Sequence, residues 1–136
     1  MKVLFMCTAN SCRSQMAEAW ARALFPDGWE ASSAGLITYP ITDRTRAAMA
    51  EVGISMEGQH TKSLDGLALD DFDLIVTLSR QATLFLPVLA HPERHLKCPI
   101  PDPMSATGSP EKIHAAFAAG RDRIREIVAG IVVDHA

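Results

Sequence analysis

The sequence predicts a single α/β domain over residues 1–136, in which a four-stranded parallel sheet carries helices on both faces. Two observations lead to this fold class. Short apolar runs alternate along the chain with segments of helical periodicity, which is typical of parallel strands joined by right-handed helical crossovers. The length of 136 residues, with 48% hydrophobic and 21% charged residues, suits one globular domain that buries its own core.

The first two elements are a buried strand and a helix. Residues 2–6 form an apolar run that ends at a polar loop, as buried parallel strands do. Residues 13–24 then follow helical periodicity, and the turn-forming residues 26–28 end this helix. The helix face expected to be buried consists of Met16, Trp20, Ala23 and Leu24.

The remaining elements continue the alternation. Thr42 and Ser109 are suited to be N-cap residues, and Gly53 stands where a helix commonly ends. Residues 55–70 are polar and mixed, so we expect a loop there with at most one short helical turn. The expected strands are residues 29–34, 72–78 and 95–100, and the expected helices are residues 43–52, residues 79–85 and a long last helix from Pro110.

Charge and composition argue against several classes of function. The chain has 13 Lys and Arg against 16 Asp and Glu, and a net charge of −3 does not favour a nucleic-acid partner. No window approaches the roughly 20 apolar residues of a membrane span, and the first apolar run is too short for a signal peptide. We therefore expect a cytoplasmic protein without a membrane partner. Three cysteines are too few for a disulfide scaffold, so they favour chemistry or core filling.

The loop between the first strand and the first helix, Cys7 to Ser14, is the candidate site. Its residues are small, and Asn10 tolerates the left-handed backbone conformation that a tight loop needs. The amide N–H groups of such a loop and the helix dipole favour a bound anion, and Arg13 adds a planar fork for two oxygens of a tetrahedral oxyanion. These features also favour the thiolate form of Cys7, to which Ser14 can donate a hydrogen bond. The expected oxyanion-binding residues are Thr8, Ala9, Asn10, Ser11, Cys12, Arg13 and Ser14.

Cys7 is therefore predicted to be a nucleophile that faces a bound phosphate or arsenate. The alternative, in which Cys7 is a small core residue and Arg13 a solvated helix residue, is disfavoured by the position of the motif between a strand and a helix. A covalent adduct on sulfur needs a proton donor for its leaving group, and Asp102 is the candidate general acid. It stands between two prolines after the last expected strand, at the same end of the sheet as Cys7. An aspartate in an ordinary turn is the competing interpretation.

Several motifs together resemble one family. The segment Cys7 to Glu18 (CTANSCRSQMAE), with Ser33-Ala34-Gly35 and Asp102-Pro103, resembles the low-molecular-weight protein tyrosine phosphatases, and in particular the arsenate reductases that share their fold. Ser14-Gln15-Met16 and Thr77-Leu78 are similar to the reductase branch, since the phosphatases usually have Ser-Pro and Met-Asp there. The resemblance covers nearly the whole chain and implies a flavodoxin-like winding of the sheet.

The resemblance also implies a role for each matching residue of the site. Cys7 would be the nucleophile, Arg13 with the loop amides would clamp the oxyanion, and Asp102 would be the general acid. Ser14 would steady the thiolate, and Asn10 would hold the shape of the loop.

Some positions separate the two branches or depart from both. Tyr39 lies shortly after Ser33, where the phosphatases often place an aromatic that contacts substrate, whereas the tyrosine that commonly follows Asp-Pro is Met104 here. Glu18 and Ser33 match positions that help to build a cation site in some reductases. Lys62 lies near the usual position of an aspartate of that site, so its ammonium would replace the metal, and we predict no bound metal.

The remaining cysteines do not complete the pattern of the thioredoxin-coupled reductases. Those enzymes carry two further cysteines that move a disulfide outward, and this chain has Ser79 and Leu86 at those positions. Cys12 shares the loop with Cys7 and is either its redox partner or a small buried side chain. Cys98 lies roughly 13 Å back along its strand from the candidate acid, whereas a disulfide needs Cα atoms within about 7 Å. We therefore expect Cys98 in the core.

The expected function is arsenate reduction by Cys7 with no bound cofactor. An external thiol would be the reductant: glutathione, mycothiol or a glutaredoxin-type protein. The first alternative is a phosphotyrosine phosphatase, in which water resolves the adduct on Cys7. The second alternative is a non-catalytic oxyanion or redox sensor, which the odd number of cysteines allows.

Overall fold

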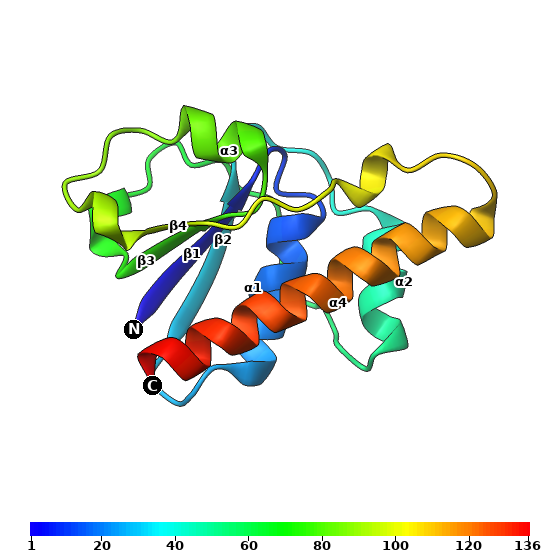
Figure 1. Ribbon diagram of the computed structural model, residues 1–136, viewed down its shortest axis with the longest axis horizontal. Helices are drawn as coiled ribbons and strands as arrows, with labels where there is room; N and C mark the ends of the chain where they lie inside the picture. Colours follow the sequence, from blue (N-terminus) through cyan, green and yellow to red (C-terminus); the bar gives the residue numbers. More distant parts are fainter.

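The structure is a computed structural model that describes residues 1–136, and a parallel sheet of four strands forms its centre (Figure 1). The strands are β1 (Lys2–Cys7), β2 (Glu30–Gly35), β3 (Leu74–Thr77) and β4 (His95–Lys97). They lie in the order β2-β1-β3-β4, and all neighbouring pairs are parallel. The predicted fold class is therefore confirmed. Because the chain moves from β1 to one side and then to the other, the carboxyl end of β1 lies at the switch point of the sheet, where ligands commonly bind.

Four helices and three short 3-10 turns connect the strands. The helices are α1 (Arg13–Leu24), α2 (Asp43–Glu51), α3 (Arg80–Phe85) and α4 (Pro110–His135). The turns are Leu69–Asp71, Pro92–Arg94 and Pro103–Ser105. Thr42, Ser79 and Ser109 each cap a helix by accepting a hydrogen bond from the amide N–H three residues later, which confirms the two predicted caps.

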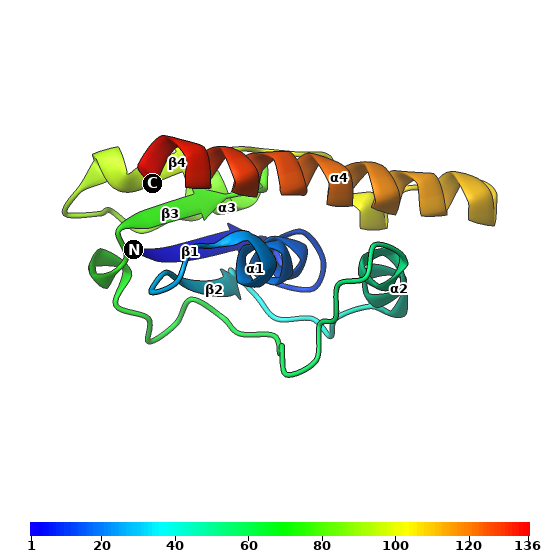
Figure 2. The ribbon, with the colours of Figure 1, turned by 90° about the horizontal axis from the view of Figure 1, so that it is seen from below.

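The larger core lies between the sheet and two helices. Helices α1 and α4 pack on one face of the sheet, and α3 lies on the other face (Figure 1). Helix α4 runs along the length of the molecule, and α2 lies beside its N-terminal half (Figure 2). Arg121 of α4 joins these two helices, because its Nη1 donates to the carbonyl oxygen of Ala48 and to Glu51, each at 2.9 Å. The buried centre of this core includes Val3, Phe5, Met16, Val76, Ile124 and Val128.

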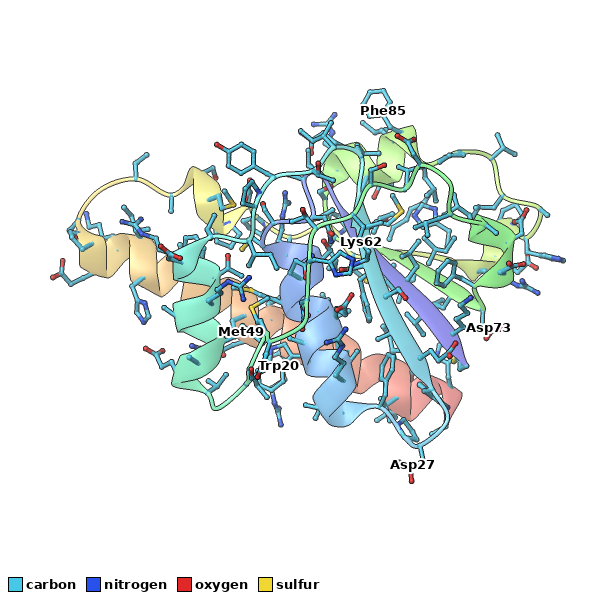
Figure 3. All side chains as sticks on the ribbon, turned by 180° about the vertical axis from the view of Figure 1, so that it is seen from behind. Trp20, Asp27, Met49, Lys62, Asp73 and Phe85 are labelled. Carbon is cyan, nitrogen blue, oxygen red and sulfur yellow. The ribbon has the colours of Figure 1, made fainter.

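The opposite face of the sheet has a smaller core. Leu4, Met6 and Ile75 point to this side because side chains alternate along strands. Ala82 of α3 and leucines from the loops before β3 and after α3 cover them. Phe85 at the end of α3 projects outward and is exposed (Figure 3).

The expected strands 72–78 and 95–100 are both shorter in the structure, whereas the other boundaries agree within one residue. β3 begins later because Phe72 still caps the turn Leu69–Asp71, and its N–H donates to the carbonyl oxygen of Leu69 at 3.2 Å. After β4, the amides of Cys98 and Ile100 still donate, at 2.9 and 3.2 Å, to the carbonyls of two successive residues, Thr77 and Leu78, at the end of β3. The segment after β4 therefore advances by two residues where the segment beside it advances by one, and the regular hydrogen-bond ladder ends.

The predicted face of α1 needs one correction. The periodicity places Ala23 on the buried face, but Ala23 is exposed and Leu24 only half-buried. Every residue from Arg13 to Ala21 is buried instead, because α1 is enclosed by α4, β1 and β2. No helix combines the length and the apolar sequence that crossing a membrane requires.

Candidate active site

The loop that follows β1 turns its carbonyl groups outward. The carbonyl oxygens of Thr8 and Ala9 accept the N–H groups of Ile37 and Tyr39 at 3.1 and 3.0 Å. Asn10 has a φ of 51°, which confirms the left-handed conformation expected of it. Because the segment after β2 holds these carbonyls on the outside, the N–H groups of the loop are left facing its interior.

These N–H groups have no acceptor of their own. The amides of residues 8–15 donate no hydrogen bond within the structure, to backbone or to side chain. Cys12 is the N-cap residue of α1 but its side chain makes no capping bond, and the first turn of α1 carries no acidic residue. An uncapped helix N-terminus with free amides is a binding site for an anion.

A pocket of about 270 Å³ opens over the loop and brings most of the predicted site residues together. Asn10 and Ser14 do not line it, because their side chains are buried behind the loop. These two side chains therefore support the loop from behind, whereas the other predicted oxyanion-binding residues line the pocket. The lining consists of Cys7, Thr8, Ala9, Ser11, Cys12, Arg13, Tyr39, Asp102 and Met104.

Cys7 is the last residue of β1 and forms the base of this pocket, with only 3% of its surface exposed. Its Sγ lies 2.9 Å from Oγ of Ser14. That Oγ also accepts a hydrogen bond from Nδ2 of Asn10 at 2.8 Å, so the hydroxyl hydrogen of Ser14 is free to point at the sulfur. This arrangement places a hydrogen-bond donor at the sulfur of Cys7.

Arg13 is held in place by two backbone carbonyls. Its Nη1 donates to the carbonyl oxygen of Ile100 at 3.1 Å and to that of Leu78 at 3.4 Å. Its Nη2 lies 3.7 Å from Oδ2 of Asp102, and only 9% of the side chain is exposed. The carbonyls fix the plane of the guanidinium, which leaves its other N–H groups directed at the pocket for an oxyanion.

Asp102 stands at the rim, where 42% of its side chain is exposed. Oδ1 accepts the N–H of Met104 at 3.0 Å, so the carboxyl group caps the turn Pro103–Ser105. Behind this turn, α4 carries Gly120, where a Cβ atom would lie 2.9 Å from Cγ of Pro103. The loop of the candidate acid is thus fixed by its own cap and by close packing on α4.

The other two cysteines lie in different surroundings. Burial raises the pKa of Cys12 to about 12, so it is a neutral thiol and a poor attacking group at neutral pH. Its redox pairing with Cys7 stays a prediction. Cys98 is half-buried, packs against the larger core and does not line the pocket, and burial raises its pKa as well.

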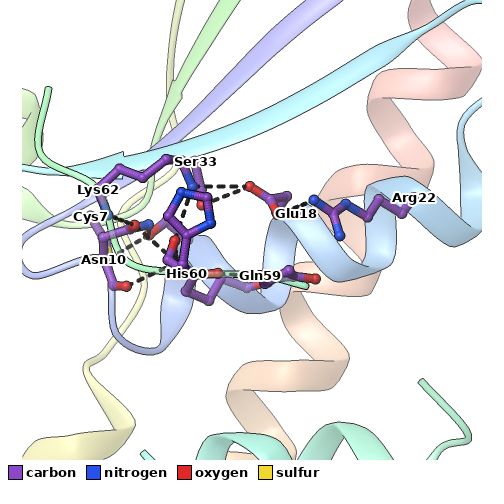
Figure 4. A network of polar contacts seen from close by, with 10 residues as sticks. Cys7, Asn10, Glu18, Arg22, Ser33, Gln59, His60 and Lys62 are labelled. Atoms are coloured by element: carbon purple, nitrogen blue, oxygen red, sulfur yellow. Dashed lines mark hydrogen bonds and ion pairs between the residues drawn. The ribbon is translucent and has the colours of Figure 1, made fainter. Parts of the chain in front are cut away.

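Glu18 is a buried carboxylate close behind the loop (Figure 4). Its Oε1 accepts the hydroxyl hydrogen of Ser33 at 3.0 Å and lies 3.5 Å from Nζ of Lys62. Its Oε2 lies 2.9 Å from Nη2 of Arg22, a charge contact without the alignment of a hydrogen bond. Two basic side chains therefore neutralise this carboxylate, and the residues present do not fit a bound cation.

Sequence reasoning missed two residues of this region, Gln15 as a structural partner of the loop and Gln59 altogether. Gln15 lies on α1 and is buried, and Gln59 comes from a polar loop segment and is buried as well. The two side chains meet, because Gln59 Nε2 donates to Gln15 Oε1 at 2.9 Å. Buried glutamines usually belong to polar networks. No pattern in residues 55–70 indicates which polar residue turns inward.

Gly35, the last residue of β2, touches the back of the loop, and its replacement tests the loop geometry. A Cβ atom there would lie 2.5 Å from Ile37 O, 2.7 Å from Asn10 N and 2.9 Å from Ala9 C, and all three are backbone atoms. We expect Gly35→Ala to displace the loop, to cost about 1–3 kcal/mol of stability and to weaken oxyanion binding about a hundredfold. The measurement is protection of Cys7 from iodoacetamide by added phosphate.

Gly130→Ala is the matched control, because nothing lies within 4 Å of a Cβ atom at that helical position. Alanine suits a helix interior better than glycine, so this variant should keep full protection and unfold at an equal or higher temperature. Phosphate protection of Gly35→Ala at the level of the unmodified protein would contradict the proposed contact.

Comparisons with known proteins agree with this geometry. An arsenate reductase of Bacillus subtilis is 37% identical over 122 residues, which cover 90% of this chain and 88% of that protein. An arsenate reductase of Halalkalibacterium halodurans is 35% identical over 122 residues, with 90% and 88% covered. A solved structure of an arsenate reductase in its phosphate-binding state superposes with a TM-score of 0.86 at 28% identity, covering 99% of this chain and 98% of that one. The family model for low molecular weight phosphotyrosine protein phosphatases matches residues 2–131, and the chain therefore belongs to this family.

Proposed function

We propose that this protein is an arsenate reductase in which Cys7 is the nucleophile and an external thiol is the reductant. The observation that carries the proposal is the pocket, where Cys7 lies beneath free loop amides and beside Arg13 and Asp102. Such a pocket suits a tetrahedral oxyanion. The identities of 37% and 35% to two arsenate reductases support arsenate as the substrate.

The first step joins the sulfur of Cys7 to arsenic. The thiolate attacks bound arsenate, so that an As–S bond forms while one As–O bond breaks. Asp102 donates a proton to the departing hydroxyl, which leaves as water. Arg13 and the loop amides bind the remaining oxygens and stabilise the charge that they carry in the transition state.

The second step supplies the electrons. The thiolate of an external thiol attacks the sulfur of Cys7, an S–S bond forms, and the electron pair of the As–S bond stays on arsenic, which leaves as arsenite. A second molecule of the thiol then attacks the mixed disulfide and releases Cys7 as a thiolate. Two thiols are thereby oxidised to one disulfide for each arsenate reduced.

Two positions support a small thiol as the reductant. Ser79 is buried, and its Oγ accepts the N–H of Ala82 at 3.0 Å and the hydroxyl hydrogen of Thr8 at 3.1 Å. Leu86 packs against the smaller core. Neither residue can receive a disulfide from Cys7 and carry it to the surface. A small thiol that enters the pocket directly replaces that step.

We therefore expect thioredoxin to fail as sole reductant. Multiple-turnover arsenate reduction should proceed with glutathione, with mycothiol or with a glutaredoxin system. With thioredoxin, thioredoxin reductase and NADPH it should stall at the Cys7–arsenic adduct, before arsenite is released. The control is Cys98→Ser, which should match the unmodified protein with small thiols because Cys98 does not line the pocket. Sustained turnover with thioredoxin that disappears in Cys98→Ser would show that Cys98 is the resolving thiol.

A phosphatase is the second candidate, and Tyr39 is the observation that favours it. This side chain is 59% exposed and lines the same pocket, where it can contact an aromatic phosphate ester. In that reaction water attacks phosphorus in the Cys7 adduct and releases phosphate. Hydrolysis of p-nitrophenyl phosphate and of a phosphotyrosine peptide, with no arsenate reduction by any thiol, would decide for this candidate.

A further inference from the structure

Two buried glutamines lie behind the loop in a chain of contacts that ends at the nucleophile. Gln15 is 0% and Gln59 is 7% exposed. Gln59 Nε2 donates to Gln15 Oε1 at 2.9 Å, and Gln15 Nε2 donates to Asn10 Oδ1 at 2.9 Å. Asn10 Nδ2 then donates to Ser14 Oγ at 2.8 Å, and that oxygen lies 2.9 Å from Cys7 Sγ. Figure 4 shows the part of this network around Asn10 and Gln59.

A backbone N–H group fixes the orientation of the Asn10 carboxamide. The N–H of Lys62 lies 2.8 Å from Oδ1 of Asn10, and a backbone N–H can only donate. The oxygen of Asn10 must therefore face Lys62. Its Nδ2 must then face Ser14, which leaves the hydroxyl hydrogen of Ser14 for Cys7.

Backbone carbonyls fix the two glutamines in the same way. Gln15 Nε2 lies 3.1 Å from the carbonyl oxygen of Asn10 and 3.0 Å from that of His60, and carbonyl oxygens can only accept. Gln59 Nε2 lies 3.0 Å from the carbonyl oxygen of Gln15. Reversing either carboxamide would place two oxygens against each other, so all three amides direct their N–H groups toward Cys7.

We propose that Gln59 and Gln15 form a hydrogen-bond relay that, through Asn10 and Ser14, stabilises the thiolate form of Cys7. Each donated hydrogen bond polarises the next, and this cooperation is stronger in a buried network than in water. Both glutamines are positioning residues, since neither lines the pocket. The inference rests on Cys7 being the nucleophile of the proposed function, and it holds whether arsenate or a phosphate ester is the substrate.

The carboxamide oxygen of Gln59, at the end of the relay, agrees with donation of the hydrogen bonds toward Cys7. Oε1 of Gln59 is buried and accepts no hydrogen bond. An unpaired buried acceptor is unfavourable for stability. Its neighbours nevertheless hold it, because the alternative orientation would bring it against the two acceptor oxygens of Gln15. The fold thus keeps the electron-rich end of the relay farthest from the sulfur.

The test compares the reactivity of Cys7 across pH in Gln15→Met and Gln59→Met, which remove the donors but keep side chains of similar length. The rate of alkylation of Cys7 by iodoacetamide is followed by peptide mass spectrometry from pH 5.5 to 8.5. We expect alkylation at pH 5.5 to slow about tenfold in Gln15→Met and about threefold in Gln59→Met, because a weaker relay leaves less thiolate. At pH 8.5 the rates should agree with that of the unmodified protein within about twofold.

The matched control is Ile124→Val, which removes a buried methyl group from α4 and none of the hydrogen bonds of the relay. It should lower the unfolding temperature and leave the pH profile unchanged. Profiles of both glutamine variants that coincide with the unmodified protein would overturn the relay. A slowing that is equal at all pH values would also overturn it, because it would indicate blocked access instead of a smaller thiolate fraction. If Gln15→Met does not fold, Gln59→Met alone decides.

The alkylation experiment tests the relay independently of the proposed function. Alkylation reads the charge state of one sulfur and needs neither arsenate nor a reductant. Failure of arsenate reduction together with the expected pH profiles would reject the reductase and retain the relay. Arsenate reduction together with unchanged profiles in both variants would do the opposite.

Discussion

Replacing Cys7 by serine is expected to abolish turnover while the fold stays intact. The hydroxyl of serine is smaller than the thiol but can keep a hydrogen bond with Ser14, so the unfolding temperature should change little. Oxygen is far less ionised and less nucleophilic there, and no other thiol stands at the base of the pocket. We expect both arsenate reduction and p-nitrophenyl phosphate hydrolysis to fall by at least about a thousandfold.

The control for this variant is Cys12→Ser, which removes the other thiol that lines the pocket. It should retain arsenate reduction, because the raised pKa of Cys12 keeps that thiol neutral and unreactive. A loss of turnover rate of less than about tenfold in Cys7→Ser would be far smaller than the loss expected when a covalent nucleophile is removed. It would show that Cys7 is not the nucleophile.

Asp102→Asn has the second largest expected effect. The amide oxygen of asparagine can still accept the N–H of Met104, so the loop should keep its shape, but the side chain can no longer deliver a proton. A general acid acts in the transition state, and we expect kcat to fall about a hundredfold with little change in KM. Steady-state kinetics with arsenate and glutathione measure both constants.

Binding of the oxyanion provides the separate readout for Asp102. Phosphate should inhibit Asp102→Asn as well as the unmodified protein, or somewhat better, because a negative charge 3.7 Å from Arg13 is removed from the pocket. Loss of phosphate inhibition with an unchanged kcat would show that Asp102 shapes the binding site and is not the acid.

The local pattern of the sequence determined the elements and the nucleophile loop. Helix α1 was predictable in its full extent because its start, its periodicity and its end lie within one short segment. The loop from Cys7 to Ser14 was predictable for the same reason. Asp102 could be placed at the same edge of the sheet, since parallel strands all end on one side. Strand β4 was predicted too long, because its ladder ends where the neighbouring strand β3 leads into α3.

Only the tertiary structure decided which groups support that loop. Lys62 meets Asn10 across 52 positions of sequence, and Gln59 meets Gln15 across 44, from a polar segment without periodicity. Arg13 is oriented by the carbonyls of Leu78 and Ile100, groups that every residue possesses and that no side-chain identity reveals. Periodicity and caps report interactions between residues that are close in sequence. These supporting contacts depend instead on how distant loops lie over the end of the sheet, which only the folded chain shows.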